Sequence, residues 1–111
     1  MEEERVQAAM QIILNAGDAR KMCKEALDAI AISDFTLAKK NMEDAQTKIT
    51  EAHKIQTDVI QAECAGEESK YSILFAHAQD TLMTINSEIN IAKQMIKIFE
   101  SYEKRIAALE K

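Results

Sequence analysis

Apolar residues recur every three or four positions along nearly the whole chain, which is the spacing of helices that bury one face. The pattern divides into three segments, at about residues 2–32, 35–65 and 69–108. Only a few residues separate these segments, and short connections join antiparallel neighbours. The pattern therefore predicts an all-α fold in which residues 1–111 form one domain, an antiparallel three-helix bundle.

Residues with turn and capping chemistry lie at both breaks. Ser33 or Asp34 can accept a hydrogen bond from an early backbone N–H of the second helix. We expect Gly66 just after the end of the second helix and Ser69 as the N-cap of the third. Inside the first segment, Gly17 costs about 1 kcal/mol relative to alanine. It is either a tolerated weak point or a place where another backbone or a ligand comes close.

The third segment is apolar around most of its circumference. Its predicted core stripe consists of Leu74, Ala78, Thr81, Ile85, Ile89, Ala92, Ile96 and Phe99. Further apolar residues lie off that stripe, namely Ile73, Phe75, Leu82, Met83, Ile91, Met95 and Ile98. Because a helix of a three-helix monomer needs only one apolar face, we expect this helix also to line an interface between subunits.

Charge and cysteine content narrow the choice of partners and compartment. The net charge of −5 disfavours nucleic acid and anionic membranes, since phosphate binding needs a basic surface. No apolar run reaches the length of a membrane span, and the acidic N-terminus lacks the pattern of a secretion signal. We therefore expect a cytoplasmic protein in which Cys23 and Cys64 are reduced, buried thiols rather than a disulfide.

A histidine in the third segment is the main candidate for chemistry. His77 is followed three residues later by Asp80, and side chains with that spacing share a helix face. A neutral imidazole is a competent nucleophile toward a phosphoryl group. An ionised Asp80 would repel that group, so a metal ion shared by several copies of Asp80 would offset the charge. Gln79 points in a different direction, and it would help His77 only from a neighbouring subunit or by fixing an interface.

Other catalytic arrangements find little support in the sequence. There is no glycine-rich phosphate loop, and no Glu-x-x-His pair of the kind that holds two iron ions in helical bundles. The second histidine, His53, lies beside the polar seam residue Gln56 and is interpreted as structural. One histidine and one aspartate also provide too few ligands for a metal-dependent hydrolase.

Four stretches give the chain a family resemblance. They are Ala16-Gly-Asp-Ala-Arg20, Asp34-Phe35, Glu51-Ala-His-Lys-Ile-Gln-Thr57 and His77-Ala-Gln-Asp-Thr-Leu-Met-Thr84. In this order they resemble the enzyme IIA component of the lactose/cellobiose (chitobiose) class of the bacterial sugar phosphotransferase system. One position departs from the family pattern, because Thr81 stands where the family usually has a second histidine. That change affects interactions at the interface more than the chemistry of His77.

The resemblance implies a fold, an assembly and a function. Three protomers would form a homotrimer, a nine-helix bundle. His77 would accept a phosphoryl group through Nε2 from the histidine-containing phosphocarrier protein and pass it to a cysteine of enzyme IIB. The sugar would enter through the membrane component IIC. Asp80 would bind a structural metal, usually taken as magnesium, on the threefold axis, and Gln79 would be a neighbour of the site.

The residues leave one alternative of a different class, a non-catalytic helical interaction module that forms a trimer and uses His77 structurally. They also leave lactose, cellobiose and chitobiose systems as alternatives. Sugar specificity resides largely in the membrane component. This chain would pass on the phosphoryl group without contacting the sugar, so its residues do not identify the sugar.

Overall fold

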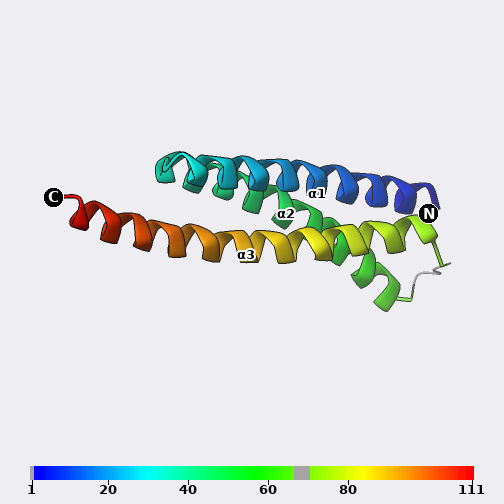
Figure 1. The fold of residues 1–111 in the computed structure, drawn as a ribbon. Coiled ribbons are helices and arrows are strands. Elements are labelled where there is room, and N and C mark those ends of the chain that lie inside the picture. Colours follow the sequence, from blue (N-terminus) through cyan, green and yellow to red (C-terminus); the bar gives the residue numbers. More distant parts are fainter. Residues whose placement is uncertain (1, 67–70) are drawn as a thin grey trace.

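Three long helices make up the structure, a computed structural model that describes residues 2–66 and 71–111. The helices are α1 (Glu2–Ala31), α2 (Phe35–Cys64) and α3 (Ile73–Leu109). They lie side by side in an elongated molecule of 66 × 20 × 18 Å (Figure 1). The all-α prediction is therefore confirmed, and the observed ends of α1 and α2 lie within one residue of the predicted ends.

The helices run up, down and up. The ion pair of Arg5 with Glu63 (3.4 Å) joins the start of α1 to the end of α2, which makes these helices antiparallel. Arg20 of α1 pairs with Glu88 of α3 at 2.8 Å, and both residues lie partway along their helices. Figure 1 shows that α1 and α3 begin at the same end of the molecule and run in the same direction.

The first turn combines a helix stop with a helix start. Ser33 adopts a left-handed backbone conformation with φ of 61°. The N–H groups of Ser33 and Asp34 donate to the carbonyls of Ile30 (2.8 Å) and Ala29 (2.9 Å), the pair of bonds that closes a Schellman motif. The side chain of Asp34 then accepts from the N–H of Leu37 at 3.0 Å. Asp34 is thus the N-cap of α2, one of the two residues predicted for this role.

At the second turn, Gly66 lies where it was predicted, but α3 begins later than predicted. Gly66 has φ of 97° directly after the C-cap of α2, as predicted. The predicted N-cap Ser69 lies outside the described residues. The structure shows that α3 begins at Ile73, four residues later than expected, because Ser72 is its N-cap and accepts from the N–H of Phe75 at 3.1 Å. Two serines three residues apart offer equivalent capping signals, and the sequence does not distinguish them.

The core is built mainly from alanines, which allow the three helices to approach closely. Its largest fully buried side chains are Ile12, Ile49, Leu82, Ile85 and Ile89. Its alanines are Ala9, Ala16, Ala19, Ala26, Ala29, Ala38, Ala45, Ala52, Ala78 and Ala92. Gln56 is the one buried polar residue among those described. Burial of these side chains along one stripe of each helix provides most of the favourable free energy of folding.

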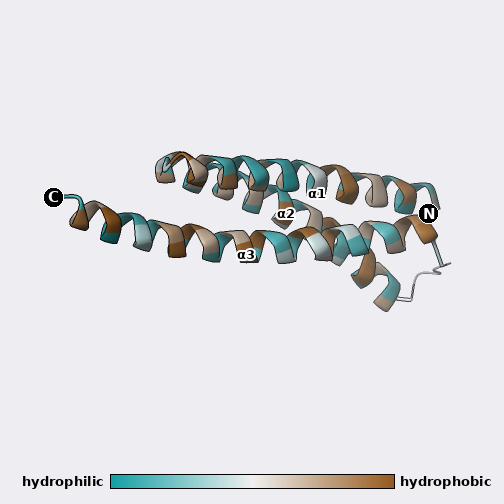
Figure 2. Cartoon of the chain, viewed as in Figure 1, coloured by the Kyte–Doolittle hydropathy of each residue, from teal (hydrophilic) through white to brown (hydrophobic). Residues whose placement is uncertain are grey.

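The core face of α3 is rotated relative to the prediction. Phe75 and Leu82, which were expected off the stripe, are buried. Leu74 and Thr81 are only half-buried, and Phe99 is 47% exposed. A helix that is apolar on most sides offers two neighbouring stripes with similar spacing, so contacts with α1 and α2 decide which stripe is covered. Figure 2 shows hydrophobic residues recurring along α3 to its C-terminal end.

The two cysteines differ in environment. Both are free, and Cys23 is buried at 5% exposure, as predicted. Burial raises the pKa of the Cys23 thiol, and the nearby charge of Glu88 adds to this effect. The prediction that Cys64 is buried is wrong. Cys64 is the last residue of α2 and lies beside the exposed Ala65 and Gly66, so the core does not cover it.

Gly17 is exposed, and a Cβ atom added to it would meet no atom of the chain within 4 Å. The close approach that was one of its two interpretations therefore does not occur within the described part of the chain. None of the described helices combines the length and the apolar character that a bilayer crossing requires.

Replacement of Gly17 by alanine tests its role. Gly17→Ala should raise the free energy of unfolding by about 0.5–1 kcal/mol, because alanine loses less backbone entropy in a helix. Urea denaturation at one fixed protein concentration measures this, with the exposed substitution Lys21→Ala as a control that should change little. A loss of stability would instead show that Gly17 contacts another molecule.

Alkylation tests the difference between the cysteines. Iodoacetamide at pH 8 should modify Cys64 at least tenfold faster than Cys23, since the reactive thiolate of Cys23 is disfavoured by burial. Peptide mass spectrometry over time gives both rates in one sample. Equal alkylation rates of Cys23 and Cys64 in the folded protein would contradict the buried position of Cys23.

Candidate functional site

His77 lies in the second turn of α3 and points away from the core. A helix turns about 100° per residue, so the buried positions Phe75, Ala78 and Leu82 direct His77 toward solvent. The imidazole is exposed and makes no hydrogen bond or ion pair to the part of the chain that the structure describes. A ring nitrogen with no protein partner is available to an incoming reactant.

Asp80 shares the outer face of α3 with His77 and is also exposed. Positions three residues apart lie about 60° apart around the helix axis. The two side chains are therefore neighbours on the helix surface, and no hydrogen bond or ion pair joins them. Over residues 2–66 and 71–111, no group of three or more His, Cys, Asp or Glu side chains is placed to hold a metal ion. A single protomer therefore offers one carboxylate at this position, and further ligands would have to come from other copies of the chain or from water.

Gln79 faces the other side of α3, as its sequence position predicted. It is half-buried and lines a small cavity of about 190 Å³ together with Arg5, Glu63 and Phe75. This cavity lies between the start of α1, the end of α2 and the start of α3. Within the protomer the structure therefore does not bring Gln79 together with His77.

Thr81 is tied to the backbone of the same helical turn. Its hydroxyl donates to the carbonyl of His77 at 2.8 Å, a bond between residues four apart. The side chain is half-buried at the edge of the core. Thr81 thus contacts the main chain of His77 and leaves the imidazole free.

A two-point ion pair joins α3 to α1 about three helical turns from His77. The guanidinium of Arg20 donates to both carboxylate oxygens of Glu88, at 2.9 and 2.8 Å. These hydrogen bonds lower the pKa of Glu88 and raise that of Arg20. The side chains are 52% and 46% exposed, so the contribution to stability is small and the main effect is on alignment. No local sequence signal could have identified this pair, whose members are 68 residues apart.

Exposed apolar residues of α1 lie level with His77. The Arg20–Glu88 pair marks positions of α1 and α3 that lie at the same height along the bundle. His77 lies eleven residues before Glu88, and Ala9 lies eleven residues before Arg20, so His77 and Ala9 are at about the same height on these parallel helices. Val6 and Met10, both 48% exposed, lie within one turn of that level. In the sequence, the four-residue spacing of Val6, Met10 and Leu14 off the core stripe is the signal of this exposed apolar surface.

The exposed face of α3 forms one continuous line, which we call the outer stripe. Its members recur at steps of three or four residues and are all exposed: His77, Asp80, Thr84, Ser87, Ile91, Met95, Ile98, Tyr102, Ile106 and Leu109. The stripe is polar in its first half and apolar in its second half. The prediction that α3 has an apolar face besides its core face is confirmed by this exposure.

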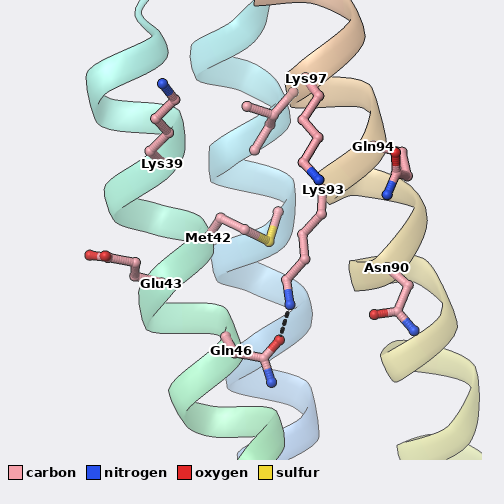
Figure 3. Close-up of a pocket in the computed structure, with 9 residues that line it drawn as sticks. Lys39, Met42, Glu43, Gln46, Asn90, Lys93, Gln94 and Lys97 are labelled. Atoms are coloured by element: carbon pink, nitrogen blue, oxygen red, sulfur yellow. Dashed lines mark hydrogen bonds between the residues drawn. The ribbon is translucent and has the colours of Figure 1, made fainter.

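A larger concavity of about 640 Å³ lies between α2 and α3, far along α3 from His77. Met42 and Ile96 contribute apolar surface, and the ammonium group of Lys93 donates to the side-chain oxygen of Gln46 (Figure 3). Lys39 and Lys97 lie at its rim (Figure 3). No histidine or cysteine lines this groove, so it does not compete with His77 as a reactive site.

The geometry around His77 suits transfer between proteins better than turnover of a small molecule. The imidazole is exposed on a helix, and His77 does not line the two cavities described above. Groups that align a reactant and exclude water would therefore have to come from a docked partner or from another copy of the chain. Such a surface can meet a donor and an acceptor in turn.

Comparisons with known proteins agree on one family. The model of "PTS system, Lactose/Cellobiose specific IIA subunit" matches residues 7–100. The lichenan-specific phosphotransferase enzyme IIA component of Bacillus subtilis is 37% identical over 100 residues, which cover 90% of this chain and 91% of that protein.

Solved structures show the same fold. The crystal structure of PtcA from S. mutans matches with a TM-score of 0.87 and 37% identity, over 90% of this chain and 98% of that chain. The solution structure of the IIA(Chitobiose)–HPr complex of the Escherichia coli phosphotransferase system matches with a TM-score of 0.77 and 30% identity, over 87% and 94% of the two chains. The chain therefore belongs to the lactose/cellobiose-specific enzyme IIA family of the sugar phosphotransferase system.

Proposed function

We propose that this chain is a phosphoryl carrier and that His77 is its phosphorylated residue. The histidine-containing phosphocarrier protein donates the phosphoryl group, and a cysteine of enzyme IIB accepts it. The observation that carries this proposal is the free, exposed imidazole at the start of α3 in a chain of this family. The solved complex of a relative with HPr supports the identity of the donor.

For phosphoryl transfer, the protein has to hold the imidazole of His77 in position and leave it accessible to the partners. The lone pair of Nε2, the outermost ring nitrogen, attacks phosphorus while the bond to the donor's histidine breaks. In the onward step the thiolate sulfur of the acceptor attacks phosphorus, the bond between phosphorus and Nε2 breaks, and His77 leaves as a neutral imidazole. Phosphoryl transfer depends mainly on alignment and on stabilisation of charge, and a rigid helix provides the alignment.

Docking surfaces for the two partners would surround His77. Val6 and Met10 place exposed apolar side chains on α1 level with the imidazole. The net charge of −5 would attract partners with basic rims and speed their encounter without making the complexes tight. Successive partners can then bind the same surface and leave it.

The outer stripe of α3 supports a homotrimer of nine helices. Its second half exposes large apolar side chains, including Ile91 (55%), Ile98 (49%) and Tyr102 (51%). A contiguous apolar surface of this kind marks an interaction site in a monomer. A threefold axis along α3 would bury these residues against their own copies.

The same axis would bring three copies of Asp80 together. Three carboxylates in one place repel, and carboxylate oxygens are suitable ligands for a hard divalent cation such as magnesium. We propose that one such ion per trimer is shared by the three Asp80 side chains. Its role would be structural, because it would offset the repulsion and leave His77 as the only reacting group.

The biological setting follows from the carrier role. The phosphoryl group would reach a lactose-, cellobiose- or chitobiose-type disaccharide that enters through the membrane component IIC, and the carrier itself would work in the cytoplasm. Gln79 would act at most through a neighbouring subunit, since it lines the cavity near Arg5 on the far side of α3.

Phosphorylation of the native chain and of variants with His77 or His53 replaced by alanine tests the proposal. Intact mass after incubation with phosphoenolpyruvate, enzyme I and the histidine phosphocarrier should show an acid-labile gain of one phosphoryl group. His77→Ala should abolish the gain, whereas His53→Ala, which alters the other exposed histidine, should retain it. A non-catalytic interaction module would instead show no gain in any of the three proteins while its assembly stays intact.

Chelation tests the role of Asp80. Sedimentation in EDTA should show the native assembly dissociating at a concentration about tenfold higher than in magnesium, because carboxylate repulsion is no longer offset. Asp80→Leu removes the repulsion and should be indifferent to EDTA, while Asp58→Leu, at an exposed carboxylate of α2, should respond like the native chain. An identical native assembly with and without EDTA would rule out a structural ion.

A further inference from the structure

The groove between α2 and α3 concentrates positive charge in an acidic chain. The chain has a net charge of −5, yet Lys39, Lys93 and Lys97 all line this concavity of about 640 Å³. Lys93 and Lys97 lie one helical turn apart on α3, and Lys39 faces them from α2. Among the described residues that line the groove, Glu43 is the one carboxylate, and it points away from α3 (Figure 3). The groove therefore carries a surplus of positive charge.

Two of the three ammonium groups have no counter-charge. Lys39 pairs with Glu100 at 2.7 Å, so its charge is offset. Lys93 donates instead to the neutral side-chain oxygen of Gln46. Lys97 makes no hydrogen bond or ion pair within the part of the chain that the structure describes. The charges of Lys93 and Lys97 are thus available to an anion from outside the chain.

The position of these two lysines strengthens their attraction for an anion. Figure 3 shows their side chains one after the other in the space between α2 and α3. Lys93 is half-buried, and the buried side chains of Met42 and Ile96 line the same groove. Charges attract more strongly where protein replaces water around them. A hydrogen bond between two ionised groups is also roughly twice as strong as one between neutral groups, so an anion would replace Gln46 as the acceptor of Lys93.

The remaining lining indicates what kind of anion fits. The volume of the groove lies within the range of about 300–1,000 Å³ that is typical of sites for small organic molecules, and it exceeds the size of a simple ion. Gln46, Asn90 and Gln94 contribute carboxamides, which both donate and accept hydrogen bonds and therefore suit hydroxyl groups. Met42 and Ile96 contribute apolar surface for carbon-bound hydrogens. A phosphorylated compound with several hydroxyl groups matches this combination.

We propose that this groove binds a sugar phosphate, whose phosphate group is held by Lys93 and Lys97. The carboxamides of Gln46, Asn90 and Gln94 hydrogen-bond to its hydroxyl groups. The choice of a phosphate follows from the groove itself. The choice of a sugar rests on the proposed function, because transport through that system would yield a phosphorylated disaccharide.

The groove is separate from the surfaces that the proposed carrier would use. Lys93 follows His77 by sixteen residues, which corresponds to about 24 Å along α3. Lys93 and Lys97 each lie two residues after a member of the outer stripe, Ile91 and Met95, and two residues place them about 160° away around the helix axis. A partner docked at His77, or a copy packed along the outer stripe, would leave both lysines on the far side of α3. The carrier could therefore bind its product while it transfers phosphoryl groups.

Calorimetric titration with cellobiose 6-phosphate tests the site. The native chain should bind this probe, should not bind unphosphorylated cellobiose, and should bind inorganic phosphate at least tenfold more weakly. Lys97→Gln should weaken binding of the probe at least tenfold, whereas Lys54→Gln, at an exposed lysine of α2 outside the groove, should stay within twofold of the native value. No binding by the native chain, equal losses in the two variants, or equal affinity for inorganic phosphate would overturn the proposal.

A carboxylate placed in the groove provides a second test. Gln46→Glu should pair with Lys93 and repel a phosphate group, so binding of cellobiose 6-phosphate should fall at least tenfold while the urea midpoint does not fall. Gln61→Glu adds the same charge at an exposed position of α2 outside the groove and should keep the native affinity. Native affinity in Gln46→Glu would contradict the assigned role of Lys93.

The same titration separates this inference from the carrier function. His77→Ala should bind cellobiose 6-phosphate as the native chain does, because the groove does not include that residue. Binding without phosphorylation of the native His77 would overturn the carrier function and leave the groove as a sugar phosphate site. Phosphorylation of His77 in a chain that does not bind the probe would overturn this inference alone.

Discussion

Close packing of α3 on the α1–α2 hairpin is the interaction on which the rest of this structure depends. Alanines such as Ala16, Ala45 and Ala78 are completely buried where the helices meet, so the backbones approach closely and few rotations of α3 are compatible with the contact. That rotation decides which residues of α3 remain in solvent. His77, Asp80 and the apolar line down to Leu109 are exposed because Phe75, Ala78, Leu82 and Ile85 are not.

The same packing is compatible with the proposed role of a carrier rather than of a self-contained enzyme. The described core is filled mainly by small side chains, and the histidine proposed to react lies on the exposed surface of a helix. Chemistry at such a residue must be completed by groups from other proteins. An exposed imidazole level with exposed apolar residues of α1 would suit this, because the proposed nucleophile and the proposed docking surface would be one.

Polarity along the outer stripe of α3 links function to assembly. In the proposed function, its polar half provides the reactive residue and a carboxylate that needs compensation, and its apolar half provides surface that needs to be covered. In the proposed trimer, each requirement is met by other copies of the chain. The departure at Thr81 fits this separation, because its hydroxyl binds the backbone carbonyl of His77 and takes no part on the outer face.

The sequence by itself determined the helices, their order and the candidate residues. The spacing of apolar positions, the caps at Asp34 and Gly66, and the shared helix face of His77 and Asp80 are local features, set by helix periodicity and turn chemistry. Only the tertiary structure decided that Phe75 and Leu82 are buried instead of Leu74 and Thr81, that Cys64 is exposed, and that Arg20 pairs with Glu88. These depend on the rotation of α3 and on contacts between distant segments, and a helix that is apolar on most sides does not encode its own rotation.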